Sequence, residues 1–177
     1  SVDRFPAPAS YWISNPNNDI QNNVAIASHG TGFWMSFVNS TRCTEAGCTQ
    51  GGGNGTLIRP VKTPTLRFDN NVAASCVVGM NWDGAQHGQK ANNSQNSGDR
   101  KIDLSHYDPR VNSQPGGQPV VPTFNGLVGY KNSRSGVYFR GEQAIFNNAI
   151  IADNGVSWFC AYNQVLKDSL VVGVSAN

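Results

Sequence analysis

Charged side chains are scarce in this chain of 177 residues, because Asp, Glu, Lys and Arg make up only 14% of it, whereas a typical soluble domain carries about 25%. The formal net charge is +2, which excludes a global field that would attract nucleic acid or an anionic membrane. Basic residues are scattered and lack the interleaved aromatic residues of a single-strand nucleic-acid groove. No apolar run is long enough to span a bilayer. We therefore expect no nucleic-acid partner and no membrane insertion.

The common catalytic and cofactor motifs are also missing. The sequence contains no nucleophile elbow, phosphate-binding loop, dinucleotide fingerprint or zinc-protease helix. Its four cysteines have neither the two-residue spacing nor the neighbouring histidines of a zinc site. Turn oxygens of Asp and Asn leave calcium open as a cofactor, although no EF-hand-like loop supports it. The sequence motifs therefore require no cofactor, and calcium is the single candidate cofactor.

The cysteines fall into two groups. Cys43 and Cys48 flank a short polar loop that a local disulfide would close. Cys76 and Cys160 lie inside apolar runs, where free thiols pack as small hydrophobic groups, so we expect both to be buried and free. The even number of cysteines fits an oxidising compartment.

Residues typical of long helices are scarce, and those that replace them predict strands. Long helices need Leu, Ala, Glu and Lys, whereas this chain has Val, Ile, Phe, Tyr and Trp in short runs punctuated by Asn and Gly. Each of the first four apolar runs is followed by a tight turn and a second apolar run, and a fifth run closes the chain. The last three runs are spaced by roughly twenty residues, which is a solenoid period. The runs lie at 24–27, 72–78, 127–130, 149–152 and 170–174.

Two all-β folds can bury short strands of this kind. In a right-handed parallel β-helix, each strand pairs with strands of the coils above and below. Asn residues recur near the turns, where they tolerate the left-handed conformation and can hydrogen-bond along the stack. The alternative is an antiparallel β-sandwich, which also uses short strands and Asn-Gly turns. The β-helix is the expected fold. The Asn residues concerned are Asn22, Asn23, Asn70, Asn71, Asn132, Asn147, Asn148 and Asn154.

Residues 1–177 are expected to form a single β-helix segment that two long polar stretches interrupt. The stretches span about 38–64 and 84–122, and loops of this length are usually functional or disordered. A β-helix also needs caps, because a bare end exposes strand edges, and this chain closes on the apolar run 170–174. We therefore expect part of a larger protein, with flanking domains or another chain stacked on its ends.

Several stretches of the sequence resemble one protein family. The run Ala9-Ser-Tyr-Trp-Ile-Ser-Asn-Pro-Asn-Asn-Asp-Ile, continuing to Gly32-Phe-Trp, is similar to a signature of the cell-migration-inducing hyaluronidase family. That family includes the transmembrane hyaluronidase and the fibrocystin-type proteins. The run Tyr130-Lys-Asn, followed by Gly136-Val-Tyr-Phe-Arg-Gly, resembles the next matching coil, and Ile151-Ala-Asp-Asn-Gly resembles the one after it. The resemblance covers most of the chain outside the two long polar stretches, which depart from the family pattern.

The resemblance implies a right-handed parallel β-helix in a secreted or cell-surface protein. It also implies that hyaluronan, or another extended polysaccharide that contains a uronate, is the substrate or partner. Such a protein presents one long strand face as a groove for the sugar chain.

Three residues are candidates for chemistry on such a glycan. Asp83 stands at a predicted strand end and is the candidate acid, since hydrolysis needs two carboxylates. His87 lies four residues on and can act as acid or base near neutral pH. Arg140 ends a strand of a later coil and suits a uronate, because its fork matches a carboxylate. Elimination would need a base and such a neutralising group. The alternatives are ordinary loop positions for Asp83 and His87, and a structural salt bridge between Arg140 and Glu142.

The candidate substrate-binding aromatic residues are Trp34 and Trp82. They follow turns at similar places in two coils, where a tryptophan either packs in the core or forms a platform for a sugar ring. Trp158 shares that pattern, whereas Trp12 is expected in the core.

The candidate substrate-binding polar residues are His29, Lys131 and Arg134. All three lie in predicted turns, where the alternative is an ordinary solvated side chain. Three functions remain open for the chain as a whole. It is an enzyme on an extracellular polysaccharide, of hyaluronidase or lyase type; a non-catalytic glycan-binding module; or an assembly element whose ends stack.

Overall fold

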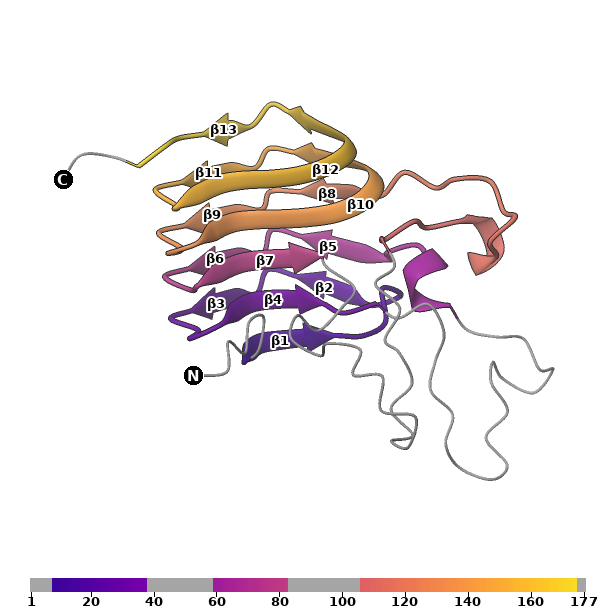
Figure 1. The fold of residues 1–177 in the computed structure, drawn as a ribbon, viewed down its shortest axis with the longest axis horizontal. Coiled ribbons are helices and arrows are strands. Elements are labelled where there is room, and N and C mark those ends of the chain that lie inside the picture. Colours follow the sequence, from indigo (N-terminus) through magenta and orange to yellow (C-terminus); the bar gives the residue numbers. More distant parts are fainter. Residues whose placement is uncertain (1–7, 38–58, 83–105, 175–177) are drawn as a thin grey trace, which may run out of the picture.

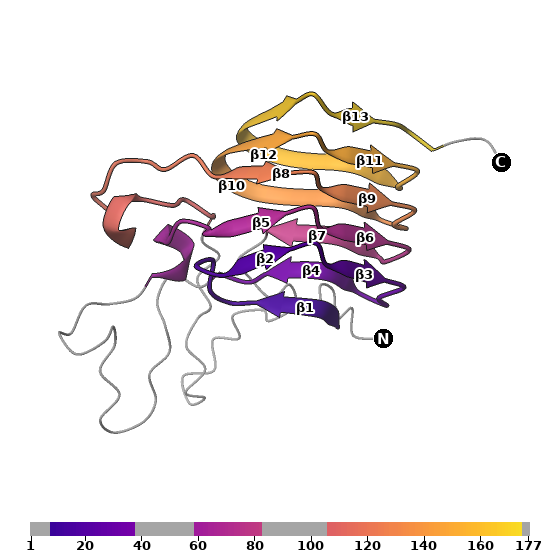
Figure 2. The same cartoon turned by 180° about the vertical axis from the view of Figure 1, so that it is seen from behind.

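The structure is a computed structural model that describes residues 8–37, 59–82 and 106–174. Short parallel strands stack in successive coils, from β1 at one end to β13 at the other (Figure 1). The view from behind shows the same coils and the strands of the far side (Figure 2). Two 3-10 helices interrupt the pattern, η1 (Pro60–Lys62) and η2 (Val111–Ser113).

The largest sheet takes one strand from each coil in the order β1-β4-β7-β10-β12. The first part of β10 pairs with β7, and its second part pairs with β8. β10 and β12 therefore bend round a corner and cover two sides of the stack, which the earlier coils cover with separate strands (Figure 1). The bounds are β1 (Ala9–Ile13), β4 (Thr31–Met35), β7 (Val78–Trp82), β8 (Thr123–Asn125), β10 (Ser135–Asn147) and β12 (Val156–Lys167).

Two smaller sheets close the coils. One has the order β13-β11-β9-β6-β3, and the other pairs β2 with β5. Their bounds are β2 (Asp19–Gln21), β3 (Val24–Ile26), β5 (Arg67–Asp69), β6 (Val72–Ala74), β9 (Val128–Tyr130), β11 (Ile150–Ala152) and β13 (Leu170–Val171).

One column of paired residues gives the length of each coil. The column runs along the five-stranded sheet and consists of Val24, Val72, Val128, Ile150 and Leu170. Successive coils, measured from one residue of this column to the next, are therefore 48, 56, 22 and 20 residues long. The spacing of about twenty residues expected for the last coils is therefore the spacing of the structure. The two longer coils are those in which residues 38–58 and 83–105 fall.

The interior of the stack is an aromatic core. Trp82 stands at its centre, with its ring centroid 5.2 Å from that of Phe68, 5.1 Å from Phe124 and 5.5 Å from Phe139. Edge-to-face and tilted contacts of this kind contribute beyond the burial of apolar area. Phe33 and Phe146 extend the cluster toward the two ends of the stack.

Asn residues recur at one corner of the coils, as the sequence predicts. Asn22, Asn70 and Asn148 each take a left-handed backbone conformation, with φ of 58°, 53° and 53°. Asn tolerates this conformation better than most other residues that carry a Cβ atom. The side chains also bond between coils, because Asn70 Nδ2 donates to Asn22 Oδ1 at 3.3 Å.

A second ladder of side-chain amides lies inside the stack. Asn132 is 1% exposed, and its Oδ1 accepts a hydrogen bond from the backbone N–H of Cys76 at 3.0 Å. Its Nδ2 donates to Asn154 Oδ1 at 2.8 Å and to the carbonyl of Ala73 at 3.1 Å. The ladder therefore joins three successive coils, which confirms the predicted role of Asn along the stack.

The pairing of strands decides between the two predicted folds. Every ladder between strands is parallel, and the single antiparallel contact in the described ranges is the isolated bridge between Arg110 and Pro119. This arrangement is an all-β, β-helix-like fold, and it rules out an antiparallel sandwich for the described residues. Over the same residues, the structure shows no helix with the length and apolarity needed to cross a membrane.

The two described cysteines differ in their exposure. Cys76 is a buried free thiol, as expected, and burial raises its pKa, although a hydrogen bond with the backbone of Ser28 opposes the shift. Cys160 is free but exposed, so the expectation of burial was wrong for this residue. It lies on β12, which is an edge strand of the large sheet, and no other described strand covers its side chain there. Cys43 and Cys48 lie outside the described residues.

This difference predicts selective thiol labelling. Under native conditions Cys160 should react with a maleimide at the rate of an open thiol. Cys76 should react at least about a hundredfold more slowly, because the reagent must wait for local opening. Mass spectrometry of digested protein would measure both rates residue by residue, and a Cys160→Ser variant would remove the fast reaction assigned to Cys160. Equal rates at the two residues would contradict the buried position of Cys76.

Candidate functional site

Both long coils leave the stack at the same corner. β4 ends at Met35 and β5 begins at Arg67, while β7 ends at Trp82 and β8 begins at Thr123. In the later coils, β10 and β12 turn this corner without interruption. η1 and the segment 106–122 lie together beside the bend of β10 (Figures 1 and 2). The ends of both long coils therefore lie beside the bend of the later coils. We refer to this region, formed by η1, the segment 106–122 and the bends of β10 and β12, as the corner site.

Tyr107 anchors the corner site in the core. Its side chain is 2% exposed, and its hydroxyl accepts a hydrogen bond from the backbone N–H of Thr65 at 2.8 Å. Burial raises the pKa of Tyr107 far above its ordinary value, although hydrogen bonds with Thr65 oppose the shift. Its backbone N–H donates to the carbonyl of Arg140 at 3.1 Å, and its carbonyl accepts from the N–H of Glu142 at 2.9 Å. These bonds fix the neighbouring His106 beside the bend of β10.

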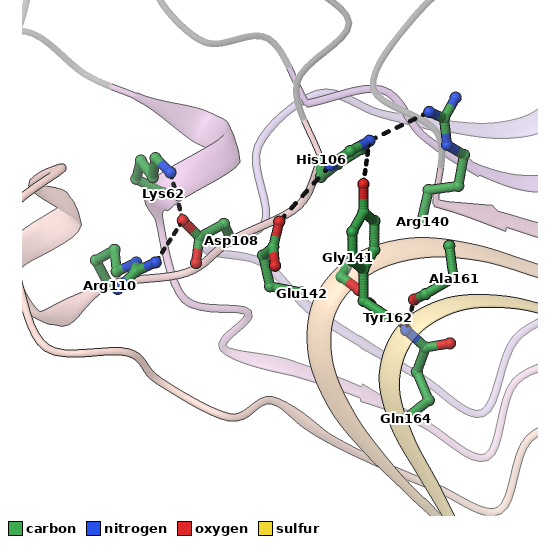
Figure 3. Close-up of polar contacts among 10 residues, drawn as sticks. All are labelled: Lys62, His106, Asp108, Arg110, Arg140, Gly141, Glu142, Ala161, Tyr162 and Gln164. Atoms are coloured by element: carbon green, nitrogen blue, oxygen red, sulfur yellow. Dashed lines mark hydrogen bonds and ion pairs between the residues drawn. The ribbon is translucent and has the colours of Figure 1, made fainter.

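His106 is the centre of the site (Figure 3). Its Nε2 lies 3.2 Å from the guanidinium Nη2 of Arg140 and 3.2 Å from the hydroxyl of Tyr162. Its Nδ1 lies 3.6 Å from Glu142 Oε1, an ion-pair distance when the ring is protonated. A guanidinium only donates hydrogen bonds, so this contact makes Nε2 an acceptor. The neutral ring therefore carries its proton on Nδ1, facing Glu142.

A mismatch between β10 and β12 shapes the bend. The register shifts between Arg140 and Gln143, so that β10 covers the corner with Gly141 and Glu142, where β12 has Tyr162 alone. A Cβ at Gly141 would lie 2.5 Å from the ring of Phe139, which explains the glycine at this point. An extra residue in one strand bends it and re-aims its side chains. As a result, Glu142 and Tyr162 both face His106 (Figure 3).

A second charged group borders the site. The Oδ2 atom of Asp108 accepts from Lys62 Nζ at 2.5 Å and from Arg110 Nη2 at 2.8 Å. Burial would raise the pKa of Asp108, but the hydrogen bonds and charges of Arg110 and Lys62 outweigh it and lower the pKa below its ordinary value. Asp108 is therefore ionised at neutral pH and is neutralised by two cations, so it cannot supply a proton.

The described charged side chains of the corner site have a positive bias. Figure 3 draws three permanently basic side chains, Lys62, Arg110 and Arg140, against the two carboxylates Asp108 and Glu142. Such a surface favours an anionic ligand. No group of three or more His, Cys, Asp or Glu side chains is placed to hold a metal ion in the described part of the chain.

Of the predicted catalytic residues, Arg140 lies in the corner site. It contacts His106 there, and the predicted structural pair with Glu142 is replaced by a pairing of Glu142 with the same histidine. Asp83 and His87 lie outside the described residues, and their roles stay predictions.

The structure corrects the expectations for the tryptophans. Trp82 is 2% exposed within the aromatic core, so its side chain is closed to a sugar ring. Trp34 is 0% exposed, and its ring stacks on that of Trp12 with centroids 4.7 Å apart. Trp12, expected in the core, is 59% exposed. Trp34 pairs with Asn81 whereas Trp82 is the next residue along, so the two indoles point to opposite faces of the sheet.

The predicted polar contacts lie elsewhere on the stack. His29 is exposed between β3 and β4, and Lys131 and Arg134 are exposed between β9 and β10. Figure 1 shows these turns at the edge of the stack opposite the corner site. The structure therefore does not bring these three residues together with Arg140.

Three residues of the corner site were missed as functional candidates. His106 and Tyr162 contact each other, with ring centroids 4.7 Å apart, although 56 residues separate them in the sequence. The sequence offers Glu142 only as a salt-bridge partner of Arg140. The one local signal is the His-Tyr-Asp-Pro run at 106–109, where a polar stretch ends on an aromatic residue.

Comparisons with known proteins agree with this fold. Residues 1–80 match the family model described as CEMIP beta-helix. The human cell surface hyaluronidase CEMIP2 is 27% identical over 186 residues, and the human cell migration-inducing and hyaluronan-binding protein is 27% identical over 182 residues. The family match and these relatives support the CEMIP-type family for this chain. The resemblance to the cell-migration-inducing hyaluronidases is thereby confirmed.

This CEMIP-type chain corresponds to a small part of its relatives. Each match to the two human proteins covers 97% of the chain but 13% of the relative. A protein of Dictyostelium discoideum is 31% identical over 182 residues, covering 97% of the chain and 16% of that protein.

Proposed function

We propose that the corner site of this chain binds and processes a uronate-containing polysaccharide of the hyaluronan type, at the cell surface or in secreted form. The observation that carries the proposal is the gathering of His106, Arg140, Glu142 and Tyr162 at the bend of β10 and β12. The names of two relatives, a cell surface hyaluronidase and a hyaluronan-binding protein, support the choice of glycan.

Each side chain has a role that its chemistry suits. Arg140 pairs with the uronate carboxylate through its planar fork, for which Arg is better suited than Lys. His106 presents Nε2 as the base, and Glu142 faces the opposite ring nitrogen. Tyr162 supplies a hydroxyl beside the same nitrogen. Within this proposal, Asp83 and His87 remain a further candidate acid and base on the long coil.

The fold serves the site by carrying residues from two long coils to one corner. In this proposal, residues 1–177 are one segment of a right-handed parallel β-helix within a larger protein. Its insertions, at about 38–64 and 84–122, bring residues such as Lys62 and His106 to the stack. The right-handed sense is the one that nearly all parallel crossover connections adopt.

A second function, glycan binding without cleavage, is favoured by the state of the carboxylates. Hydrolysis of a glycosidic bond usually uses two carboxyl groups. Asp108 is neutralised by Lys62 and Arg110, which leaves Glu142 as the available carboxylate in the described corner site.

Glycan digestion tests the enzymatic proposal. The chain would be incubated with hyaluronan, chondroitin, alginate and pectin, with and without calcium, and the products analysed by size and by ultraviolet absorbance of unsaturated uronates. Shorter hyaluronan without new absorbance supports hydrolysis, and new absorbance supports elimination. Intact polymers together with measurable binding would favour the second function.

A charge-matched pair of variants tests the site. Arg140→Gln should weaken hyaluronan binding by roughly 10- to 100-fold, because hydrogen bonds to a charged group contribute about 1.5–3 kcal/mol. Arg134→Gln removes the same charge on the opposite edge of the stack and should leave binding within about twofold. Calorimetry would compare the two. Equal affinities of the two variants would sink the assignment of the corner.

A further inference from the structure

Tyr162 has a backbone conformation that its residue type disfavours. Its φ is 71°, in the left-handed region, where an aromatic residue is a rare outlier and where Asn or Gly is usual. Packing of the side chain does not explain the conformation, because Tyr162 is 54% exposed. Residues held in this way persist only where the surrounding structure fixes them.

The surrounding structure does fix this residue. At the corner, β10 has two residues, Gly141 and Glu142, whereas β12 has only Tyr162. The strands pair again directly afterwards, between Gln143 and Asn163. Gln164 then closes the bend, because its Nε2 donates to the carbonyls of Gly141, at 2.9 Å, and of Ala161 (Figure 3). The bend of the chain therefore holds Tyr162 in the left-handed region. Its ring is exposed there because β12 is an edge strand of the large sheet.

The exposed ring of Tyr162 lies beside the guanidinium that the proposed function assigns to the uronate. Its centroid is 4.7 Å from that of His106, at an interplanar angle of 53°. Its hydroxyl reaches the same His106 nitrogen as the guanidinium of Arg140. An exposed ring beside a guanidinium offers the two contacts that an acidic glycan needs, an apolar face for one sugar and a cation for the carboxylate of the next.

We infer that Tyr162 is a specificity-determining residue of the corner site. Its ring stacks on the neutral sugar next to the uronate that Arg140 binds. The left-handed backbone conformation places the ring in this position. This inference rests on the proposed function.

Three substitutions at this position separate the ring from the backbone. Tyr162→Phe keeps the ring and should bind hyaluronan oligosaccharides within about threefold of the parent. Tyr162→Ala and Tyr162→Gly remove the ring and should each weaken binding about tenfold, the size of one aromatic contact. The Gly variant should melt about 2–4 °C above the Ala variant, because only Ala keeps the strained Cβ. Calorimetry and thermal unfolding measure the two effects on the same samples.

Controls assign each outcome. Tyr130 is exposed on the opposite edge, and Tyr130→Ala should leave binding unchanged. If Tyr162→Gly binds as the parent does while Arg140→Gln is impaired, the inference on Tyr162 falls and the proposed function stands. If the parent chain binds no oligosaccharide, both fall. Equal melting temperatures for the Gly and Ala variants would overturn the role given to the backbone.

Discussion

Replacement of Trp82 by alanine is expected to lower the free energy of unfolding by about 3–5 kcal/mol, the usual cost of removing a buried aromatic side chain. The ring is 2% exposed and contacts the rings of Phe68, Phe124 and Phe139. These neighbours belong to three different strands, so the cavity cannot close by the movement of one of them. Domains are stable by only about 5–15 kcal/mol, and the variant should lose a large part of that.

Trp12→Ala is the matched control for this effect. The two residues lose the same atoms, but Trp12 is 59% exposed and stacks on one ring, that of Trp34, so the loss should be about 1 kcal/mol. Urea titrations of both variants would give the two free energies. Similar losses would contradict the central position of Trp82, and a Trp82→Ala protein that is fully stable but has lost glycan binding would restore the substrate role first expected for it.

Replacement of Asn132 by alanine should cost about 3–5 kcal/mol, although no charge and little apolar area is lost. The change removes the acceptor of the buried N–H of Cys76 and the side-chain donor to the carbonyl of Ala73. Asn154 Oδ1 loses one of its two donors and keeps the backbone N–H of residue 132. Each buried group left unsatisfied costs about 1–3 kcal/mol. The amide proton of Cys76 should also exchange faster with solvent, because its acceptor is gone.

Asn18→Ala serves as the control for the loss of an amide. The Nδ2 of Asn18 donates to the carbonyl of Asn15 at 2.6 Å, but the bond is exposed, so water can replace it and the cost should stay within about 1 kcal/mol. Chemical denaturation and hydrogen exchange by NMR would measure both proteins. If Asn132→Ala is as stable as Asn18→Ala, the inner ladder does not hold the coils together.

The repeating part of the fold was predictable because its determinants are local. Asn22, Asn70 and Asn148 mark the corners, and the apolar runs between them give the strands. The faces of the strands were harder to predict. A strand changes face with every residue, so two tryptophans at similar distances from a turn were assigned the same role although Trp34 and Trp82 lie on opposite faces.

The corner site was only partly predictable, because its geometry depends on long-range contacts. Arg140 was found because it ends a run of β-forming residues, and its type suits a uronate. His106 reaches it only because Tyr107, within the polar stretch 84–122, is buried in the core and pairs with the bend. No local sequence pattern predicts where a long loop rejoins the stack. The residue opposite the bend, Tyr162, depends on a register shift that the sequence does not reveal.

The Asn–Asn hydrogen bonds between coils, at the corners and inside the stack, determine how the fold responds to ionic strength. Amide–amide hydrogen bonds such as that between Asn132 and Asn154 join neutral groups, and dissolved ions screen charges rather than neutral dipoles. Binding at the corner site differs, because in the proposed function Arg140 binds its ligand through a charge near the surface. Concentrated salt should therefore release an acidic glycan while the coils stay assembled, which makes attachment reversible at constant fold.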